Sequence, residues 1–93
     1  MIEIRYEAEN KRSAAYDGDK LVGYETYYVD ENGYWVIDHT KVDENYGGQG
    51  IASKLVYENV KAARENNKKI IPVCKFAQRE FEKKPEYKDV LAE

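Results

Sequence analysis

The fold of this chain is decided by a glycine-rich stretch that reads Glu44-Asn45-Tyr46-Gly47-Gly48-Gln49-Gly50-Ile51-Ala52. Tyr34 to Val42, before it, is rich in strand-forming residues, and Ala52 to about Glu65, after it, places apolar residues at helical spacing. A strand that passes into a helix through glycines exposes backbone N–H groups at the positive end of the helix dipole, with no Cβ atoms in the way. The stretch therefore predicts an anion site, with phosphate or pyrophosphate as the usual ligand.

Three further strands are predicted before this stretch. Residues 2–9 alternate apolar with charged side chains, residues 12–16 form a short strand, and residues 21–29 are rich in β-formers. Residues 17–19 and 30–33 contain the Asp, Asn and Gly residues that tight turns require. We expect these strands and the one that follows them to form consecutive antiparallel hairpins.

The residues after the first helix complete the pattern. Lys69 to Val73 reads as a short apolar strand, and Cys74 to Lys83 as a second helix that Pro85 helps to stop. A strand, a helix and a strand in succession favour a parallel pair with a right-handed crossover. The predicted order is ββββαβα, an α+β fold with a mixed sheet in which four antiparallel strands precede a βαβ crossover. At 93 residues, the chain is expected to form one domain, residues 1–93.

The composition narrows the function and the setting. A net charge of −3 argues against generic nucleic-acid binding, which needs a clustered basic surface. No apolar run approaches the ~20 residues of a membrane helix, and no basic-then-apolar leader follows Met1, so neither a membrane span nor a signal peptide is predicted. A single cysteine favours a reducing, cytoplasmic setting, and with one histidine it does not make a metal site. Oligomeric state is left open.

From Trp35 to Leu91 the chain resembles the GNAT (GCN5-related) N-acetyltransferase superfamily, and in particular its small single-domain branch. The motifs that carry the resemblance are His39-Thr40-x-Val42, Gly48-Gln49-Gly50-Ile51-Ala52, Ile71-Pro72-Val73-Cys74-Lys75-Phe76-Ala77, Phe81 and Lys84-Pro85-Glu86-Tyr87. The resemblance implies an acetyl-CoA-dependent N-acetyltransferase. Its acceptor would be an amine of a small molecule or a protein, which attacks the thioester directly.

The resemblance also implies where coenzyme A lies. The main chain of Thr40, Lys41 and Val42 would hold the pantetheine arm, where the fourth and fifth strands splay apart. Asn67 and Lys69 are candidates for contact with the adenosine phosphate. The CoA pyrophosphate would accept hydrogen bonds from the backbone N–H groups of Gly48, Gln49, Gly50, Ile51 and Ala52.

Gly47 is a departure from the family pattern within the cofactor site. The superfamily turn usually has Arg or Gln at this position, whose side chain makes a contact that glycine lacks. The backbone cradle can survive, because N–H groups do the holding. We therefore expect weaker cofactor binding, or compensation by a neighbour such as Gln49.

Two residues are candidates for chemistry. Cys74 begins a helix directly after a strand, which favours a thiolate; it is a candidate nucleophile, a residue that lines the thioester pocket, or a small buried hydrophobe. His39 is a candidate general base or a partner for Cys74, or a structural residue. Strand alternation places Ile37, His39 and Lys41 on one face and Thr40 on the other.

Two other functions compete with catalysis. Only Glu9-Asn10-Lys11 separates the first two strands, so the acceptor side is expected to be shallow and open. A CoA-binding module without catalysis is therefore the main alternative. A structural or partner-binding domain without a ligand is the third.

Overall fold

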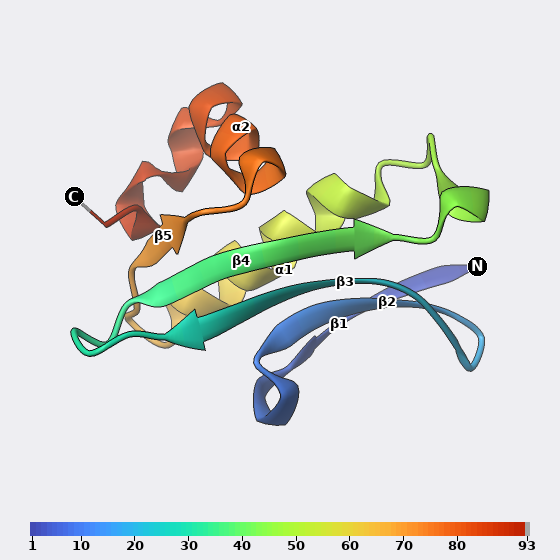
Figure 1. Ribbon diagram of the computed structural model, residues 1–93, viewed down its shortest axis with the longest axis horizontal. Helices are drawn as coiled ribbons and strands as arrows, with labels where there is room; N and C mark the ends of the chain where they lie inside the picture. Colours follow the sequence, from blue (N-terminus) through green and yellow to red (C-terminus); the bar gives the residue numbers. More distant parts are fainter. Residues whose placement is uncertain (93) are drawn as a thin grey trace.

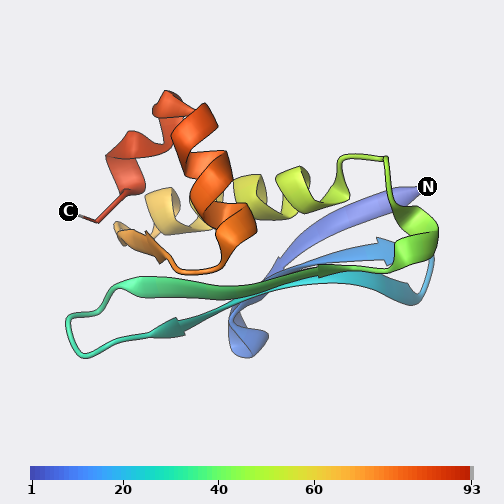
Figure 2. The ribbon, with the colours of Figure 1, turned by 45° about the horizontal axis from the view of Figure 1, so that its top comes forward.

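The computed structural model describes residues 1–92 of the chain, and it contains one five-stranded sheet with two α-helices on one face (Figures 1 and 2). The order ββββαβα and the mixed α+β fold are confirmed. None of the helices in these residues has the length and apolar character needed to cross a bilayer. The elements are β1 (Ile2–Glu7), η1 (Ala8–Asn10), β2 (Arg12–Asp17), β3 (Lys20–Val29), β4 (Trp35–Val42), η2 (Glu44–Tyr46), α1 (Ile51–Glu65), β5 (Ile70–Pro72), α2 (Lys75–Lys83) and η3 (Pro85–Val90), where η marks a 3-10 helix.

The strands follow the order β1-β2-β3-β4-β5, with antiparallel pairing up to β4 and a parallel β4–β5 pair. The parallel ladder pairs only Trp35–Ile37 of β4 with β5, which is shorter than predicted. Residues 91–92 contact β5 on its other side, since Leu91 forms an isolated bridge with Ile70 and the N–H group of Ala92 donates to the Ile70 carbonyl. The predicted first strand also ends early, because residues 8–10 turn into η1.

A bulge in β4 changes which side chains face the helices. The register shifts between Thr26 and Tyr27, which pair with His39 and Ile37, so Asp38 is the extra residue. Ile37 is fully buried in the core and Thr40 contacts Cys74, whereas the side chain of His39 is exposed. The prediction that Ile37 and His39 share a face is therefore wrong, because strict alternation fails at a bulge.

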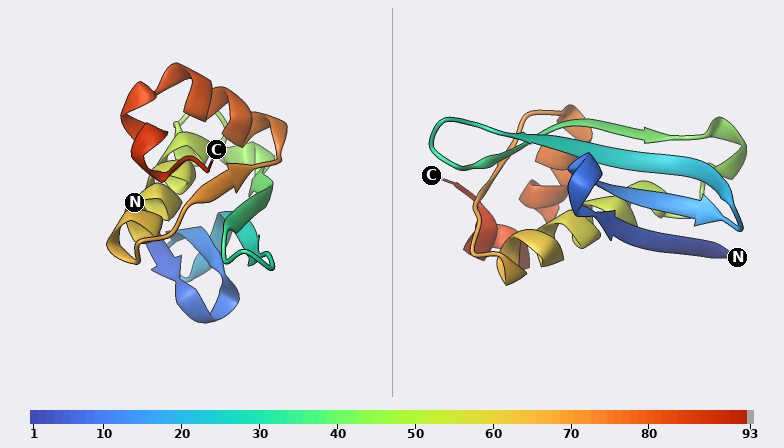
Figure 3. Two further views of the ribbon diagram at one scale, coloured as in Figure 1. Left: turned by 90° about the vertical axis from the view of Figure 1, so that its left-hand side faces the viewer. Right: turned by 90° about the horizontal axis from the view of Figure 1, so that it is seen from below.

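The core lies between the sheet and α1, as the end view of Figure 3 shows for the two layers. A large cluster joins Trp35 and Ile37 of the sheet to Val60 of α1 and Phe81 of α2. A smaller cluster places Ile51 and Leu55, at the start of α1, against Ala15 and Val22. Burial of side chains such as Leu55 contributes about 1.5–3 kcal/mol each. The small cluster thus fixes the N-terminus of α1 beside the start of β3 and the end of β4.

Candidate functional site

The glycine turn presents free backbone donors at the start of α1. Gly48 and Gly50 have φ values of +79° and +72°, which residues with a Cβ rarely adopt. A Cβ at either position would meet nothing within 4 Å, so the space before the turn is open. Gly50 is the N-cap and provides no side-chain hydrogen bond. The N–H groups of Ile51 and Ala52 in the first helical turn are therefore available to a ligand.

A pocket of about 180 Å³ lies against this turn. It brings together strand β4, the glycine turn, the start of α1 and one residue of α2. Three of its residues, Tyr46, Ser53 and Phe76, were not predicted as site residues. The lining residues are Val42, Tyr46, Gly47, Gly48, Gly50, Ile51, Ala52, Ser53 and Phe76.

Tyr46 ties the glycine turn to the β2–β3 hairpin. Its hydroxyl donates to Asp17 at 2.7 Å, and the Lys20 Nζ atom lies 5.6 Å from its ring centre. This hydrogen bond raises the pKa of Tyr46 and lowers that of Asp17. The Asp43 side chain also accepts from the Asn45 N–H group at 2.9 Å, which caps η2. The turn is thus held from two sides while its N–H face stays open.

The outer edge of β4 is free beyond the short β5 ladder. The N–H groups of Val73 and Cys74 both donate to the Ile37 carbonyl, at 2.9 and 3.2 Å, where the two strands part. Within residues 1–92, no strand pairs with Thr40–Val42 on that side. This splay leaves main-chain groups of β4 available beside the pocket, and their contact with a pantetheine arm stays a prediction.

Cys74 lies at this splay and begins α2. Its Sγ atom accepts from the Ala77 N–H group at 3.4 Å, so the thiol is the N-cap of the helix. The same atom lies 3.3 Å from the Thr40 Oγ1 atom. The side chain is half-buried. The predicted position of Cys74 between a strand and a helix, next to the edge of β4, is thus confirmed.

A buried carboxylate that the sequence did not reveal stands behind Thr40. Glu25 of β3 is 0% exposed, and its Oε2 atom accepts from the Thr40 hydroxyl at 2.7 Å. The Asn59 amide of α1 donates to Glu25 Oε1 at 2.9 Å. Burial raises the pKa of Glu25 to about 7 against the effect of these hydrogen bonds, so the carboxyl titrates near neutral pH. Its signal in the sequence is a single acidic residue inside the β-forming run of residues 21–29.

The comparison with known families decides the assignment. A family model for GCN5-related N-acetyl-transferases matches residues 5–90. The chain belongs to this family. The superfamily that the sequence motifs indicated, and its acetyltransferase class, are therefore confirmed.

Solved structures share the GCN5-related fold. A GCN5-like protein of Staphylococcus aureus is 39% identical, with a TM-score of 0.73 over 97% of this chain and 87% of its own. A Bacillus anthracis acetyltransferase in complex with acetyl coenzyme A is 21% identical, with a TM-score of 0.61 over 77% of this chain and 43% of its own. Arabidopsis thaliana Naa50, in complex with the bisubstrate analogue CoA-Ac-MVNAL, is 20% identical, with a TM-score of 0.55 over 89% of this chain and 65% of its own. No curated protein matches this chain.

His39 is not joined to Cys74 in this GCN5-related domain. Its side chain is exposed and its pairing partner is Thr26, while the neighbouring Thr40 contacts the thiol. The predicted pairing of His39 with Cys74 has no contact in the structure. A role for His39 as a base for an incoming amine stays a prediction.

Asn67 and Lys69 follow the C-terminal end of α1, at the opposite end of this helix from the glycine turn. They line a separate pocket of about 230 Å³ with Arg64 and Asp89, and the Lys69 ammonium donates to the Asp89 carbonyl. A helix of 15 residues is about 22 Å long, and it separates this pocket from Gly50. The structure therefore does not bring Asn67 or Lys69 to the glycine turn, and their contact with the adenosine phosphate stays a prediction.

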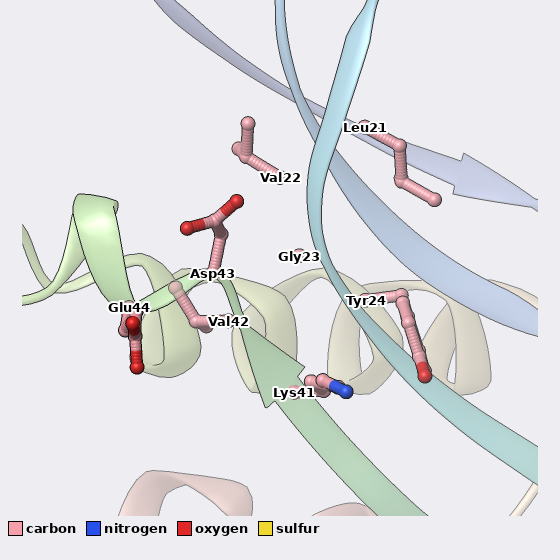
Figure 4. Close-up of a pocket in the computed structure, with 8 residues that line it drawn as sticks. All are labelled: Leu21, Val22, Gly23, Tyr24, Lys41, Val42, Asp43 and Glu44. Carbon is pink, nitrogen blue, oxygen red and sulfur yellow. The ribbon is translucent and has the colours of Figure 1, made fainter.

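A larger pocket of about 420 Å³ lies where β3 begins and β4 ends. It is lined by residues 21–24 and 41–44, and it shares Val42 with the smaller pocket. Figure 4 shows the carboxylates of Asp43 and Glu44 on one side of Gly23, with Leu21 and Tyr24 on the other. This arrangement places two carboxylates and the Lys41 ammonium around the end of β4.

Proposed function

We propose that the chain binds acetyl-CoA at the glycine turn and transfers the acetyl group to an amine by direct attack. The observation that carries the proposal is the open, left-handed turn that runs into the uncapped α1 beside the unpaired edge of β4. Membership of the GCN5-related family supports it. Two proteins that share the fold have been solved with acetyl coenzyme A or a CoA bisubstrate analogue, which supports the ligand.

The pyrophosphate fits the turn for electrostatic reasons. The N–H groups of Gly48, Gln49 and Gly50, together with those of the first turn of α1, surround an open space at the positive end of the helix dipole. The pantetheine arm would then run along the free edge of Thr40–Val42. This path leads away from the turn and towards Cys74, so the thioester would lie near the splay of β4 and β5.

Direct transfer asks little of the protein. Main-chain N–H groups polarise the thioester carbonyl, and the neutral amine attacks once it is held in position. The pocket at Asp43 and Glu44 is our candidate for the acceptor side, because its two carboxylates outnumber the single Lys41 ammonium and favour an amine that arrives as a cation. The acceptor is a small-molecule or protein amine. We also retain the cytoplasm as the proposed location, supported by the single cysteine.

A CoA-binding module without catalysis is the second candidate. The connection between β1 and β2 is only η1, Ala8–Asn10, with Lys11 after it, so no long element shapes an acceptor site there. An open acceptor side favours binding over selective transfer. A thiol-release assay with a panel of amines separates the two functions, because only an enzyme liberates CoA at a rate that depends on the amine.

The binding proposal is tested with two matched glycine variants. Gly50→Val places a branched side chain in front of the turn, and we expect it to weaken acetyl-CoA binding more than about tenfold in isothermal titration. Gly33→Val is the control, because Gly33 has a similar φ of +82° and similar open space but lies at the other end of β4. Circular dichroism checks that both variants are folded. If Gly50→Val binds as tightly as the parent and the control, acetyl-CoA binds elsewhere.

A further inference from the structure

A continuous chain of hydrogen-bonding groups runs from the interior of the protein to Cys74. The Asn59 amide donates to Glu25 Oε1 at 2.9 Å, the Thr40 hydroxyl donates to Glu25 Oε2 at 2.7 Å, and Cys74 Sγ lies 3.3 Å from Thr40 Oγ1. Glu25 and Asn59 are 0% exposed, while Cys74 is half-buried. This series of hydrogen-bonding groups joins β3, β4, α1 and α2, and it ends at the proposed thioester position.

The charges around Glu25 favour its neutral form. Glu80 of α2 is 3% exposed and adds a negative charge, although its partner Lys84, at 2.8 Å, offsets part of it. No cation pairs with Glu25 itself in residues 1–92; its partners there are Thr40 and Asn59. A buried carboxyl without a cation holds its proton more tightly than an exposed one. Glu25 is therefore able to store and release a proton near neutral pH.

We propose that Glu25 supplies, through the Thr40 hydroxyl, the proton that the Cys74 thiol gives to the sulfur of the departing coenzyme A. Glu25 is a positioning residue in this proposal, because it acts through Thr40 and never touches the substrate. The proposal rests on the proposed function for its substrate. It assigns roles to Glu25 and Thr40 that the motifs of the glycine turn do not contain.

The proton transfer balances without another reactant. The bond between the acetyl carbon and the CoA sulfur breaks as the amine nitrogen bonds to that carbon. The leaving sulfur takes the proton of Cys74, Cys74 takes the hydroxyl proton of Thr40, and Thr40 takes the proton of neutral Glu25. Glu25 becomes a carboxylate, the proton lost by the amine goes to water, and Glu25 is reprotonated from water.

The direction of the hydrogen bonds between Glu25, Thr40 and Cys74 depends on the charge of Glu25. When Glu25 is ionised, the Thr40 hydroxyl must donate to it, so the Cys74 thiol is the donor to Thr40. When Glu25 is neutral, it donates to Thr40, and the hydroxyl turns to donate to Cys74 Sγ. The second arrangement stabilises a thiolate, and the first arrangement opposes it. The reactivity of the Cys74 thiol should therefore depend on the protonation state of Glu25.

This coupling is tested on the intact protein with iodoacetamide, which alkylates Cys74 and needs no coenzyme A. The alkylation rate is measured from pH 5 to pH 10. In the parent it should rise about tenfold per pH unit below pH 6, flatten near pH 7 as Glu25 ionises, and rise again. The alkylation rate of the Glu25→Gln variant should rise with pH without this flat region. It should equal the parent rate at pH 5.5 and exceed it about tenfold at pH 8, because the carboxylate that repels the thiolate is gone.

Two Thr40 variants test the intermediate hydroxyl. Thr40→Ser keeps the hydroxyl and should keep the flat region near pH 7. Thr40→Val has a similar shape without a hydroxyl. The flattening of its alkylation rate near pH 7 should be several-fold smaller than in the parent, because only the through-space effect of the Glu25 charge remains. These two variants also keep the proposal testable if Glu25→Gln does not fold, which circular dichroism will show.

The outcomes separate this inference from the proposed function. If the alkylation rate of Glu25→Gln flattens near pH 7 as in the parent, Glu25 does not act on Cys74. If the pH profile of Thr40→Val is identical to that of the parent, the effect does not pass through the Thr40 hydroxyl. In the thiol-release assay, Glu25→Gln should lower kcat about tenfold, with little change in the KM for acetyl-CoA. Failure of acetyl-CoA to bind would refute the proposed function and leave the alkylation result unaffected.

Discussion

At the residue scale, Gly47 differs from the glycines that follow it. Its φ and ψ are −65° and 157°, an extended conformation that any residue adopts. A Cβ there would lie 3.5 Å from the Glu44 carbonyl oxygen, which is an ordinary contact. Gly47 also lines the pocket at the glycine turn. The backbone therefore does not require glycine at this position, and a longer side chain can be tested without strain.

Gly47→Arg should tighten acetyl-CoA binding by about 0.5–2 kcal/mol, the range for one charge-assisted hydrogen bond to the phosphates. Isothermal titration measures the change. Gly47→Ala is the matched control, because it adds a Cβ without a charge and should bind like the parent. An arginine variant that binds no tighter than the alanine variant would mean that the chain already compensates, with Gln49 as the predicted source.

At the scale of elements, β3 and α1 meet at a carboxyl that makes their contact sensitive to pH. The pKa of Glu25 is about 7 in the folded protein and near 4.5 when exposed, so the folded state binds its proton more tightly. Its contribution to stability is complete below about pH 4.5 and is lost as the pH rises through 7. A shift of this size corresponds to about 3 kcal/mol.

Glu25→Gln removes this titration and should gain stability over the parent as the pH rises from 5 to 8, up to about 3 kcal/mol. Urea unfolding at both pH values measures the difference. Asp17 and Asp89, whose pKa values are lowered by hydrogen bonds from Tyr46 and Arg64, change stability in the opposite direction, but they do so equally in both proteins. If the difference in the free energy of unfolding between Glu25→Gln and the parent is the same at pH 5 and pH 8, Glu25 does not ionise in this range.

The order of the elements was predictable from the sequence because each has a strong local signal. The alternation in β1, the helical spacing in α1 and the glycine turn agree with one another, and the structure follows them. The bulge at Asp38 has no such signal, since pairing with β3 creates it. That bulge determines that Thr40, and not His39, contacts Cys74.

The candidate site was predictable only in part, for related reasons. The turn from Gly47 to Ala52 and the end of β4 come together as expected. Glu25 was missed because an acidic residue in a strand usually faces water, and only the fold shows that α1 covers it. Asn67 and Lys69 lie at the other end of α1 from the turn, so the fold does not join them to the rest of the candidate site.

At the scale of the whole molecule, the two layers of residues 1–92 leave one face of the sheet without an α-helix (Figure 2). The exposed side chain of His39 belongs to β4, at whose end the pocket at Asp43 and Glu44 lies. Little on this side limits the size of an acceptor. We therefore expect peptide amines and small amines to be acetylated with values of kcat/KM within about tenfold of each other.

A thiol-release assay with a lysine peptide, an N-terminal peptide amine and a small diamine measures these values. A preference of more than about a hundredfold for one class would mean that the open face selects its acceptor. Glu44→Gln, which removes one exposed carboxylate, should raise the KM for the diamine more than that for acetyl-CoA.

The contact of residues 91–92 with β5 also bears on how this protein avoids self-association. An edge strand with free N–H and C=O groups is a template for another chain. The Ala92 N–H group occupies the Ile70 carbonyl, and the Leu91 bridge covers that end of β5. At the other edge, β1 alternates its apolar residues with Glu3, Arg5 and Glu7, and charges of this kind discourage pairing. The β1 edge and the Ile70 end of β5 are thus guarded against the edge-to-edge growth that leads to aggregates, which leaves the Thr40–Val42 segment of β4 as the free edge in residues 1–92.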